Sequence, residues 1–325
     1  MKVRQLGERR LIERIRGAES AHVPGVILGI GDDAAVVCGP RRLLVTTDML
    51  VEGVDFLKRI HPPRLLGRKA LNVNLSDIAA MGGRPLHAVL GLAVPGTTDV
   101  RWVDDFLAGF RSAAREHGVA LIGGDISDAG EVVISVTVTG EANRFVTRSG
   151  AKPGDAIFVS GTLGDAAMGL RLLKRGGAAR SNANARPLIK AFLDTSPRLE
   201  LGTILARERL ASAMIDISDG LSVDLRHICE ESGAGAEIEL GKVPLSAGLR
   251  RFAKDPLALA LNGGEDFELL FTVRPANVPR VRRLARRFDL SEIGRVKSGR
   301  RILAIDASGK KTTLVAKGYE HFRGR

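Results

Sequence analysis

The residues best suited to chemistry in this sequence are aspartates that stand beside glycines or hydroxyl side chains. Taken alone, such a residue is more often part of a turn or a helix cap, because Gly-Asp pairs favour turns and Ser or Asp side chains cap helices. Here they recur in six segments: Gly29–Ala34, Thr46–Asp48, Asn72–Asp77, Gly123–Asp125, Asp216–Gly220 and Gly263–Asp266. Several of these segments fall at the ends of expected strands, which indicates that they share one site.

The chemistry that fits many carboxylates with few neighbouring lysines is magnesium binding. Mg²⁺ prefers oxygen ligands and is usually held by a few carboxylates together with waters and substrate phosphates. Several carboxylates would repel a polyphosphate, but metal ions between them reverse the sign of that interaction. Phosphoryl transfer needs mainly alignment and charge neutralisation, and glycines let backbone N–H groups approach phosphate oxygens. The six segments therefore predict a nucleotide site that holds several magnesium ions.

Other nucleotide and catalytic motifs do not fit the sequence. Gly29–Ala34 matches the dinucleotide pattern G-x-G-x-x-A, but that pattern needs a helix next, and Ala34–Cys38 predicts a short strand. Asp32 and Asp33 would also repel a phosphate directly. The sequence contains no P-loop, no H-E-x-x-H and no Gly-x-Ser-x-Gly segment. The predicted site therefore belongs to another nucleotide-binding class.

The elements that must position these residues alternate between strand-length apolar runs and helical periodicity, which predicts a mixed α/β (α+β) architecture. In the first half we expect strands at Arg42–Val51, Leu86–Val94, Val119–Ile122 and Val132–Thr139, and helices at Arg64–Met81 and Val100–His117. In the second half we expect strands at Ala156–Ser160 and Phe267–Val273, and helices at Ala166–Lys174, Arg198–Leu210, Ser222–Glu231 and Val278–Phe288, the last with a solvated basic face. Turn-forming residues between Arg148 and Asp155 predict a boundary between two domains, 1–148 and 149–325.

The helix expected at Arg64–Met81 carries two of the polar candidates. Asn74 and Asp77 are three residues apart and share one helical face, so both side chains can project together. The alternative is that Asn74 is simply tolerated on a polar stripe.

Composition limits the remaining classes of function. The chain has 325 residues, a formal charge of +12 and 44% hydrophobic residues, which excludes wholesale disorder. It shows no membrane span and no secretory leader, so we expect a cytoplasmic protein, and Cys38 and Cys229 suggest neither a disulfide framework nor a zinc site. The basic surplus is expected to form a solvated surface rather than a nucleic-acid interface, because only 4% of residues are aromatic and no nucleic-acid motif accompanies the charge.

The ordered set of segments resembles thiamine-monophosphate kinase, a family of the aminoimidazole-ribonucleotide-synthetase-like ATP-binding superfamily. The resemblance is carried by Gly29–Ala35, Thr47–Gly53, Asn72–Gly82, Leu121–Asp125, Thr147–Asp155, Ile215–Leu221, Gly263–Leu270 and Lys317–Phe322, in this order. It implies a two-domain fold whose N-terminal domain binds ATP and Mg²⁺ and pairs its sheet with a second subunit in a homodimer, while the C-terminal domain completes the substrate site. It also implies direct in-line transfer of the ATP γ-phosphoryl group to thiamine monophosphate, without a phosphoenzyme.

Carried over residue by residue, the resemblance implies three groups of site residues. Metal-binding positions are matched by Asp33, Thr46, Thr47, Asp48, Asp77, Asp125, Asp216 and Asp219. ATP-binding positions are matched by Gly124, Asp125, Arg148 and Ser218, and thiamine-side positions by Asp55, Glu265 and Tyr319. Among these, Asp125, Asp219 and Arg148 are the expected catalytic residues.

Three of these residues carry a physical argument of their own. The guanidinium of Arg148 beside a glycine-rich turn suits a phosphate. Tyr319 is the only tyrosine of the chain and is expected to stack on a thiamine ring. Asp55 stands where many relatives have His, and its carboxylate is expected to attract the permanently cationic thiazolium.

Two alternatives stay open beside this resemblance. One is another enzyme of the superfamily, although a selenophosphate synthetase would carry a reactive Cys before the first Gly-Asp segment, and no Cys precedes Cys38. A hydrogenase-maturation relative would end in a modified Cys, and a purine-pathway synthetase lacks support from Lys317–Phe322. The other alternative is a basic nucleic-acid-associated protein with a degenerate nucleotide site. It is disfavoured because the six candidate ligands Asp33, Asp48, Asp77, Asp125, Asp216 and Asp219 are all present.

Overall fold

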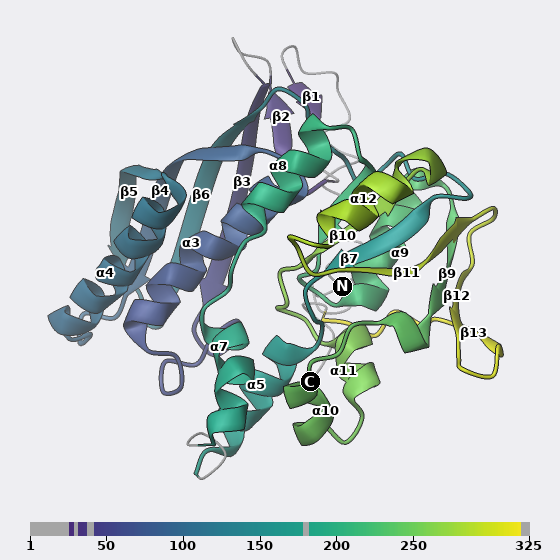
Figure 1. Ribbon diagram of the computed structural model, residues 1–325. Helices are drawn as coiled ribbons and strands as arrows, with labels where there is room; N and C mark the ends of the chain where they lie inside the picture. Colours follow the sequence, from purple (N-terminus) through teal and green to yellow (C-terminus); the bar gives the residue numbers. More distant parts are fainter. Residues whose placement is uncertain (1–25, 29–31, 38–41, 178–181, 320–325) are drawn as a thin grey trace, which may run out of the picture.

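The computed structural model describes residues 26–28, 32–37, 42–177 and 182–319 (Figure 1). Gly29–Gly31, Cys38 and the last residues of the Lys317–Phe322 segment lie outside the described residues. The predicted short strand at Ala34–Cys38 is present in its described part as β2.

Two sheets organise the described residues. The first has the order β1-β2-β3-β6-β4-β5 and consists of β1 (Val26–Leu28), β2 (Ala35–Val37), β3 (Arg42–Val51), β4 (Arg84–Val94), β5 (Ala120–Asp128) and β6 (Val133–Ala142). The second has the order β13-β12-β9-β11-β7-β10-β8 and consists of β7 (Ala156–Ser160), β8 (Ala211–Asp216), β9 (Gly235–Glu239), β10 (Leu269–Val273), β11 (Leu290–Lys297), β12 (Ile302–Ile305) and β13 (Lys311–Thr313). The mixed α/β architecture predicted from the sequence is confirmed.

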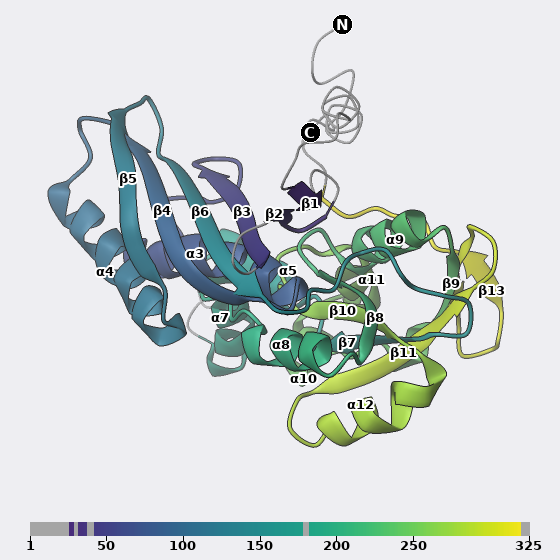
Figure 2. The same ribbon diagram turned by 90° about the horizontal axis from the view of Figure 1, so that it is seen from above.

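The first sheet has one face covered by helices and one open face. Burial along β6 alternates strictly, so that Ile134, Val136 and Val138 are buried under α3 (Pro63–Ala80) and α4 (Val100–His117). Figure 2 shows both helices on the same side of the sheet. Both ends of α4 carry capping residues. Asp99 caps the first turn, and Gly118 ends the helix in the left-handed conformation.

Helix α3 is the central element of the molecule. It lies between the first sheet and the C-terminal half, where it contacts α8 (Leu199–Arg207) and β8 (Figure 1). Contacts on both sides bury most of its length, including the polar residues Lys69, Asn72, Asn74 and Ser76. Because buried polar groups need partners, these side chains must be satisfied by neighbouring elements.

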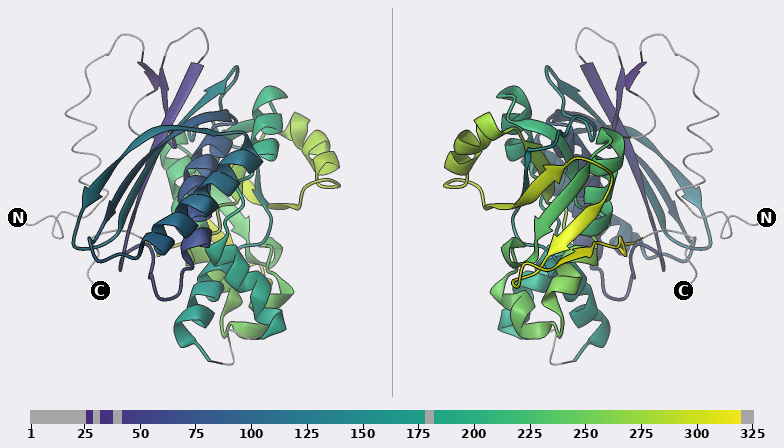
Figure 3. Two further views of the ribbon diagram at one scale, coloured as in Figure 1. Left: turned by 90° about the vertical axis from the view of Figure 1, so that its left-hand side faces the viewer. Right: turned by 90° about the vertical axis from the view of Figure 1, so that its right-hand side faces the viewer.

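Helices α9 (Leu221–Ser232) and α12 (Val278–Leu284) pack on the second sheet. Helices α5 (Asp165–Arg175), α7 (Arg186–Leu193), α10 (Ala247–Phe252) and α11 (Pro256–Asn262) pack mainly on one another, and 3₁₀ turns lie at Ala183–Ala185, Leu240–Lys242 and Pro275–Asn277. Strand β7 lies between β11 and β10 and is buried along its whole length. Figure 3 shows this half of the molecule beside the covered face of the first sheet, so the two halves meet along α3 and α8.

Most predicted elements are confirmed, and several differ in extent. Strand β6 continues to Ala142 beyond the predicted Thr139, and α8 ends at Arg207 instead of Leu210. Strand β5 continues to Asp128, so Gly123–Asp125 lies inside a strand rather than after one. Strand β10 begins at Leu269 because Phe267 has a φ of 50°, which a strand does not allow. Helix α12 ends at Leu284 instead of Phe288.

The basic face predicted for α12 is paired with surface carboxylates. Arg280 contacts Glu208, Arg282 contacts Glu292, and Arg287, beyond the helix, contacts Glu200. These three arginines of the expected solvated face therefore form surface ion pairs, which contribute little to stability. Within the described residues, no helix combines the length and the apolarity that crossing a membrane requires.

The close crossing of α3 and α4 gives a first prediction. A Cβ atom on Gly109 would lie 1.8 Å from the carbonyl oxygen of Arg64, so Gly109→Ala must push the helices apart. We expect this substitution to lower the free energy of unfolding by about 3 kcal/mol, measured by chemical denaturation. Gly130→Ala is the control, because no heavy atom lies within 4 Å of that Cβ. An equal effect of both substitutions would contradict the close crossing.

Candidate functional site

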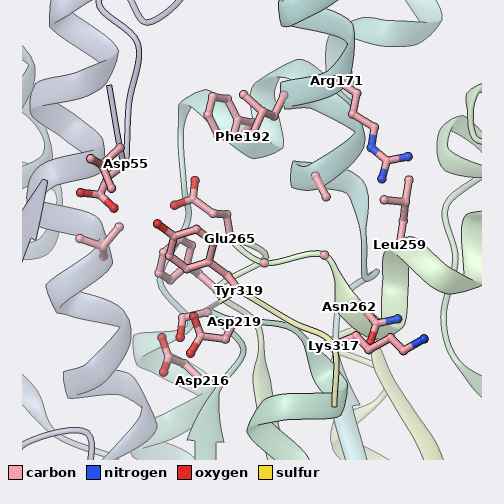
Figure 4. A pocket seen from close by; sticks show the side chains of 18 of the residues that line it. Asp55, Arg171, Phe192, Asp216, Asp219, Leu259, Asn262, Glu265, Lys317 and Tyr319 are labelled. Atoms are coloured by element: carbon pink, nitrogen blue, oxygen red, sulfur yellow. The ribbon is translucent and has the colours of Figure 1, made fainter. Parts of the chain in front are cut away.

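A cavity of about 1210 Å³ lies between the two halves of the molecule. One wall comes from β3 and α3, and the opposite wall comes from α5, α11, the segment after β8 and the 262–267 loop. Of the residues predicted for the site, those that line it are Asp48, Asp55, Asp77, Asp216, Ser218, Asp219, Glu265 and Tyr319. In Figure 4, Asp216 and Asp219 mark one end, while Glu265 and Tyr319 lie close together between them and Phe192.

Three carboxylates from separate elements meet at the acidic end. One carboxylate oxygen each from Asp33, Asp77 and Asp216 lies within 4.8 Å of the other two. Asp33 precedes β2, Asp77 is in the last turns of α3, and Asp216 ends β8. Carboxylate oxygens are ligands that a divalent cation such as Mg²⁺ prefers, so these three residues are candidate ligands.

Hydroxyl groups fix the orientation of two of these carboxylates. Thr46 Oγ1 on β3 donates a hydrogen bond to Asp77 Oδ2 at 2.5 Å. Ser76 Oγ donates to Asp216 Oδ2 at 2.7 Å, so α3 holds the end of β8 directly. The cluster is therefore positioned before any ligand binds.

Burial and mutual repulsion change the acidity of the cluster. Burial raises the pKa of Asp77 and of Asp216 well above the usual range, and neighbouring aspartates add to the shift. Burial together with Asp33 and Asp55 raises the pKa of Asp48 to about 6. Burial and the charge of Asp33 raise the pKa of Asp32 to about 7. In the absence of a cation, ionisation of these carboxylates is therefore unfavourable, and a bound cation would favour their ionised forms.

Arg148 supplies positive charge at this end of the cavity. Its Nη2 lies 2.7 Å from Asp33 Oδ1, and its backbone N–H donates to Asp32 Oδ2 at 3.1 Å. Burial alone would lower the pKa of Arg148, but the charge and hydrogen bonds of Asp33 raise it above the ordinary value. Arg148 therefore stays cationic and is anchored beside the acidic cluster.

Asn74 does not project into the cavity with Asp77. It is buried, its Oδ1 accepts the backbone N–H of Asp48 at 3.0 Å, and its Nδ2 donates to the Ala70 carbonyl. The amide thus ties α3 to β3 and fixes the backbone that presents the Asp48 side chain.

The loop that carries Glu265 has an unusual backbone. Glu265 has a φ of 74° and Phe267 a φ of 50°, a region that non-glycine residues rarely occupy. Both backbone N–H groups donate to the segment after β8, from Glu265 to the Ser218 carbonyl at 2.7 Å and from Phe267 to the Ile217 carbonyl at 2.8 Å. Between them, Asp266 accepts the N–H of Gly164 next to the start of α5. These bonds hold the strained loop with Glu265 at the cavity wall.

The C-terminal segment closes another part of the wall. The backbone N–H of Tyr319 donates to the Asp219 carbonyl at 3.1 Å. A Cβ atom on Gly318 would lie 2.3 Å from that same carbonyl oxygen, so only glycine permits this approach. The Tyr319 ring is thereby placed close to Glu265 (Figure 4).

Three predicted site residues, Thr47, Gly124 and Asp125, lie away from the cluster of buried aspartates. Thr46 and Asp48 point toward α3, so Thr47, between them on β3, points to the open face, where its hydroxyl bonds the Val136 carbonyl and Thr137. The strand register places Asp125 on that same open face, opposite Gly91 of β4. Gly124, like Asp125, lies on β5, the exposed edge strand. The Thr47 side chain therefore lies away from the cluster, and the metal-binding role predicted for Thr47 stays a prediction.

Several residues at the site were missed by sequence reasoning. Asp224 on α9 accepts the backbone N–H groups of Asp219 and Gly220, and burial raises its pKa well above the usual range. Asp224 is an acidic residue in the first turn of α9, where the helix dipole favours negative charge, and this signal could have found it. Four cations that also line the cavity, Arg171, Lys174, Lys254 and Lys317, carry no comparable signal in sequence.

Family models match both halves of the chain. Residues 31–142 match the AIR synthase related protein N-terminal domain, and residues 152–306 match the corresponding C-terminal domain. Thiamine-monophosphate kinase of Aquifex aeolicus is 38% identical over an alignment of 330 positions that covers 99% of this chain and 100% of that protein. The protein of the same name from Escherichia coli K12 is 40% identical over an alignment of 326 positions that covers 96% of each chain.

Solved structures agree with this relationship. The structure described as AaThiL complexed with AMPPCP and TMP is 38% identical, covers 99% of both chains and has a TM-score of 0.88. A thiamine monophosphate kinase structure from Aquifex aeolicus has a TM-score of 0.83 at 36% identity, covering 96% of this chain and 99% of that chain. Hydrogenase maturation protein HypE has a TM-score of 0.70 at 21% identity over 89% of this chain and 93% of that chain, a likeness of fold.

The raised pKa values give a second prediction, for Asp48→Asn in metal-free protein. A carboxyl group whose pKa is raised on folding stabilises the fold below its unfolded pKa, and this contribution is lost as the pH rises through the folded value. For Asp48 the loss falls between about pH 4 and about pH 6. We therefore expect Asp48→Asn to raise the thermal midpoint at pH 8 by roughly 2–5 °C and by less at pH 5, measured by calorimetry. A variant that is less stable than the wild type at pH 8 would contradict this electrostatic description.

Proposed function

The chain belongs to the thiamine-monophosphate kinase family, and we propose that it transfers the γ-phosphoryl group of ATP to thiamine monophosphate. An oxygen of the thiamine phosphate attacks the γ-phosphorus in line, the bond to the β-phosphate oxygen breaks, and ADP and thiamine diphosphate leave. The observation that carries this proposal is the meeting of Asp33, Asp77 and Asp216 at one end of a cavity whose wall also carries Glu265 and Tyr319.

Magnesium fits the acidic end on chemical grounds. The donors are oxygens that come within 4.8 Å of one another. Burial raises the pKa of Asp77 and of Asp216, so a cation beside them would favour their ionised forms. We propose that the ligands come from Asp33, Asp48, Asp77, Asp216 and Asp219, with the Thr46 hydroxyl orienting Asp77. Several bound ions would supply neutralisation of the phosphate charges.

The two substrates are proposed to use different residues around this end. We propose that Arg148 and Ser218 serve the ATP phosphates. Support comes from the cationic Arg148 beside Asp33 and from Ser218, which lines the cavity next to Asp219. Asp55, Glu265 and Tyr319 are proposed to receive the thiamine part. The Asp55 carboxylate already accepts the backbone N–H of Val51 at 2.8 Å, so its position is fixed relative to β3.

A homodimer is proposed because β5 is poorly covered in the single chain. All nine residues of this edge strand are exposed, including Ile122 at 62% and Ile126 at 76%. Met49 and Val89 are also exposed on the open face of the sheet. An uncovered apolar edge strand favours pairing with another chain.

The proposed roles of Gly124 and Asp125 in ATP and metal binding therefore depend on this assembly. The 1–148 and 149–325 domains and the cytoplasmic location stay predictions.

The third prediction tests the reaction directly. With ATP, Mg²⁺ and thiamine monophosphate, we expect the wild type to form thiamine diphosphate, measured by chromatography of the products. Asp216→Asn should lower kcat on the order of 100-fold, because it removes a carboxylate from the cluster. Asp105→Asn on the exposed face of α4 is the matched control and should leave the rate unchanged. No thiamine diphosphate at any magnesium concentration would refute the proposed function.

The fourth prediction concerns assembly. We expect the wild type to sediment with twice the 34.7 kDa mass of one chain. Ile126→Lys should shift it toward the monomer, because a charge at the edge strand opposes pairing. Val100→Lys is the control: Val100 is 71% exposed but lies at the start of α4. Identical masses for wild type and Ile126→Lys would reject β5 as the interface.

A further inference from the structure

A buried lysine lies behind the cavity wall without lining the cavity. The side chain of Lys69 on α3 is only 1% exposed. Its Nζ forms an ion pair with Glu265 Oε2, donates to the Phe192 carbonyl at 3.0 Å and lies 4.1 Å from the centroid of the Phe192 ring. A buried ammonium group is tolerated only when it is paired and hydrogen-bonded, and these three contacts meet that need.

His61, another titratable group near Lys69, does not balance the charge of the lysine. His61 is buried beside Phe192, with ring centroids 5.6 Å apart. Burial, with a smaller contribution from the charge of Lys69, lowers the pKa of His61 to about 3, so the imidazole is neutral. The carboxylate that balances Lys69 is therefore that of Glu265.

Glu265 is the residue of the strained loop that faces the cavity. Its left-handed backbone is held by the bond to Ser218, while its side chain crosses from the C-terminal half to reach α3. The ion pair with Lys69 thus joins the two halves of the molecule at the cavity wall.

The same helical face connects this pair to the acidic end. Lys69, Val73 and Asp77 follow one another at four-residue intervals on α3, and Val73 and Asp77 both line the cavity. Eight residues of helix span about 12 Å. One rigid helix therefore fixes the separation between Asp77, in the metal-binding cluster, and Lys69, at the thiamine side.

We propose that Lys69 is a positioning residue for recognition of thiamine monophosphate, an inference that rests on the proposed function. It holds the carboxylate of Glu265 at the wall and offsets its negative charge. Glu265 then serves the substrate as an oriented hydrogen-bond acceptor for an N–H group, and attraction of the cationic thiazolium is left to other carboxylates. Substrate selection at this wall depends on geometry more than on net charge.

The fifth prediction uses Lys69→Met, Lys69→Arg, Glu265→Gln and the Lys69→Met/Glu265→Gln double variant. We expect Lys69→Met to raise the KM for thiamine monophosphate about 10-fold, with the KM for ATP changed less than about twofold. Lys69→Arg, which keeps the charge, should recover part of the loss. Because both residues act through one contact, the double variant should be no worse than the more affected single variant.

Lys58→Met is the matched control. Lys58 lies over the Trp102 ring, 5.0 Å from its centroid, and does not line the cavity. It should leave both KM values unchanged. The proposal is overturned if the two single effects simply multiply, if the KM values for ATP and thiamine monophosphate rise together, or if Lys69→Met changes neither.

Two further readouts keep the test decisive. If Lys69→Met does not fold, Lys69→Arg and Glu265→Gln replace it, and unchanged KM values for thiamine monophosphate in both would overturn the proposal. Calorimetric binding of thiamine monophosphate without ATP separates the two levels of inference. A wild type that forms product while the variants bind like it refutes only the role of Lys69, whereas a wild type with neither binding nor turnover refutes the proposed function as well.

Discussion

The structure depends on the repulsion between carboxylates that are held together in a buried place. Two unit charges 4.8 Å apart repel by about 3 kcal/mol at the effective dielectric of a protein surface, and more when buried. When they are ionised, Asp33, Asp77 and Asp216 repel one another, and Asp32 and Asp48 lie close by. Arg148 offsets part of it at Asp33, and the hydroxyls of Thr46 and Ser76 stabilise the charged forms of Asp77 and Asp216. The repulsion that these contacts do not offset favours the binding of cations, which phosphoryl transfer requires.

Helix α3 is the element that makes this arrangement possible. Apolar residues bury it between the first sheet and α8, and its polar residues are each given a partner from another element. Asn74 fixes the backbone of β3, Ser76 fixes the end of β8, and Asp77 enters the cluster. The polar side chains of one helix thus set the relative positions of both halves of the site.

Local sequence patterns were sufficient for the elements with strong signals. The bounds of β3, α4 and β7 follow from strand-length apolar runs and from caps such as Asp99 and Gly118. The acidic segments also identified the residues that meet in the cavity. Short elements such as α10, α11 and β13 were missed, because few residues carry their pattern and their packing partners are distant in sequence.

The remaining differences arise from tertiary contacts. The side-chain direction of Thr47 depends on which face of β3 meets α3, and the ion pair of Lys69 with Glu265 joins residues 196 positions apart. The place of Asp125 follows from the position of β5 at the edge of the sheet. No local pattern contains this information.

The central claim is that the buried aspartates form a magnesium site, and proton release on metal binding tests it most directly. Because the pKa of Asp48 is raised to about 6 and that of Asp32 to about 7, Mg²⁺ must displace protons from the cluster near pH 6. Titration calorimetry with Mg²⁺ in two buffers of different ionisation enthalpy measures this release. We predict a net release of protons near pH 6 that declines toward pH 8 and is reduced in Asp216→Asn. Magnesium binding with no proton release at pH 6, and equal binding by Asp216→Asn, would contradict a magnesium site at these aspartates.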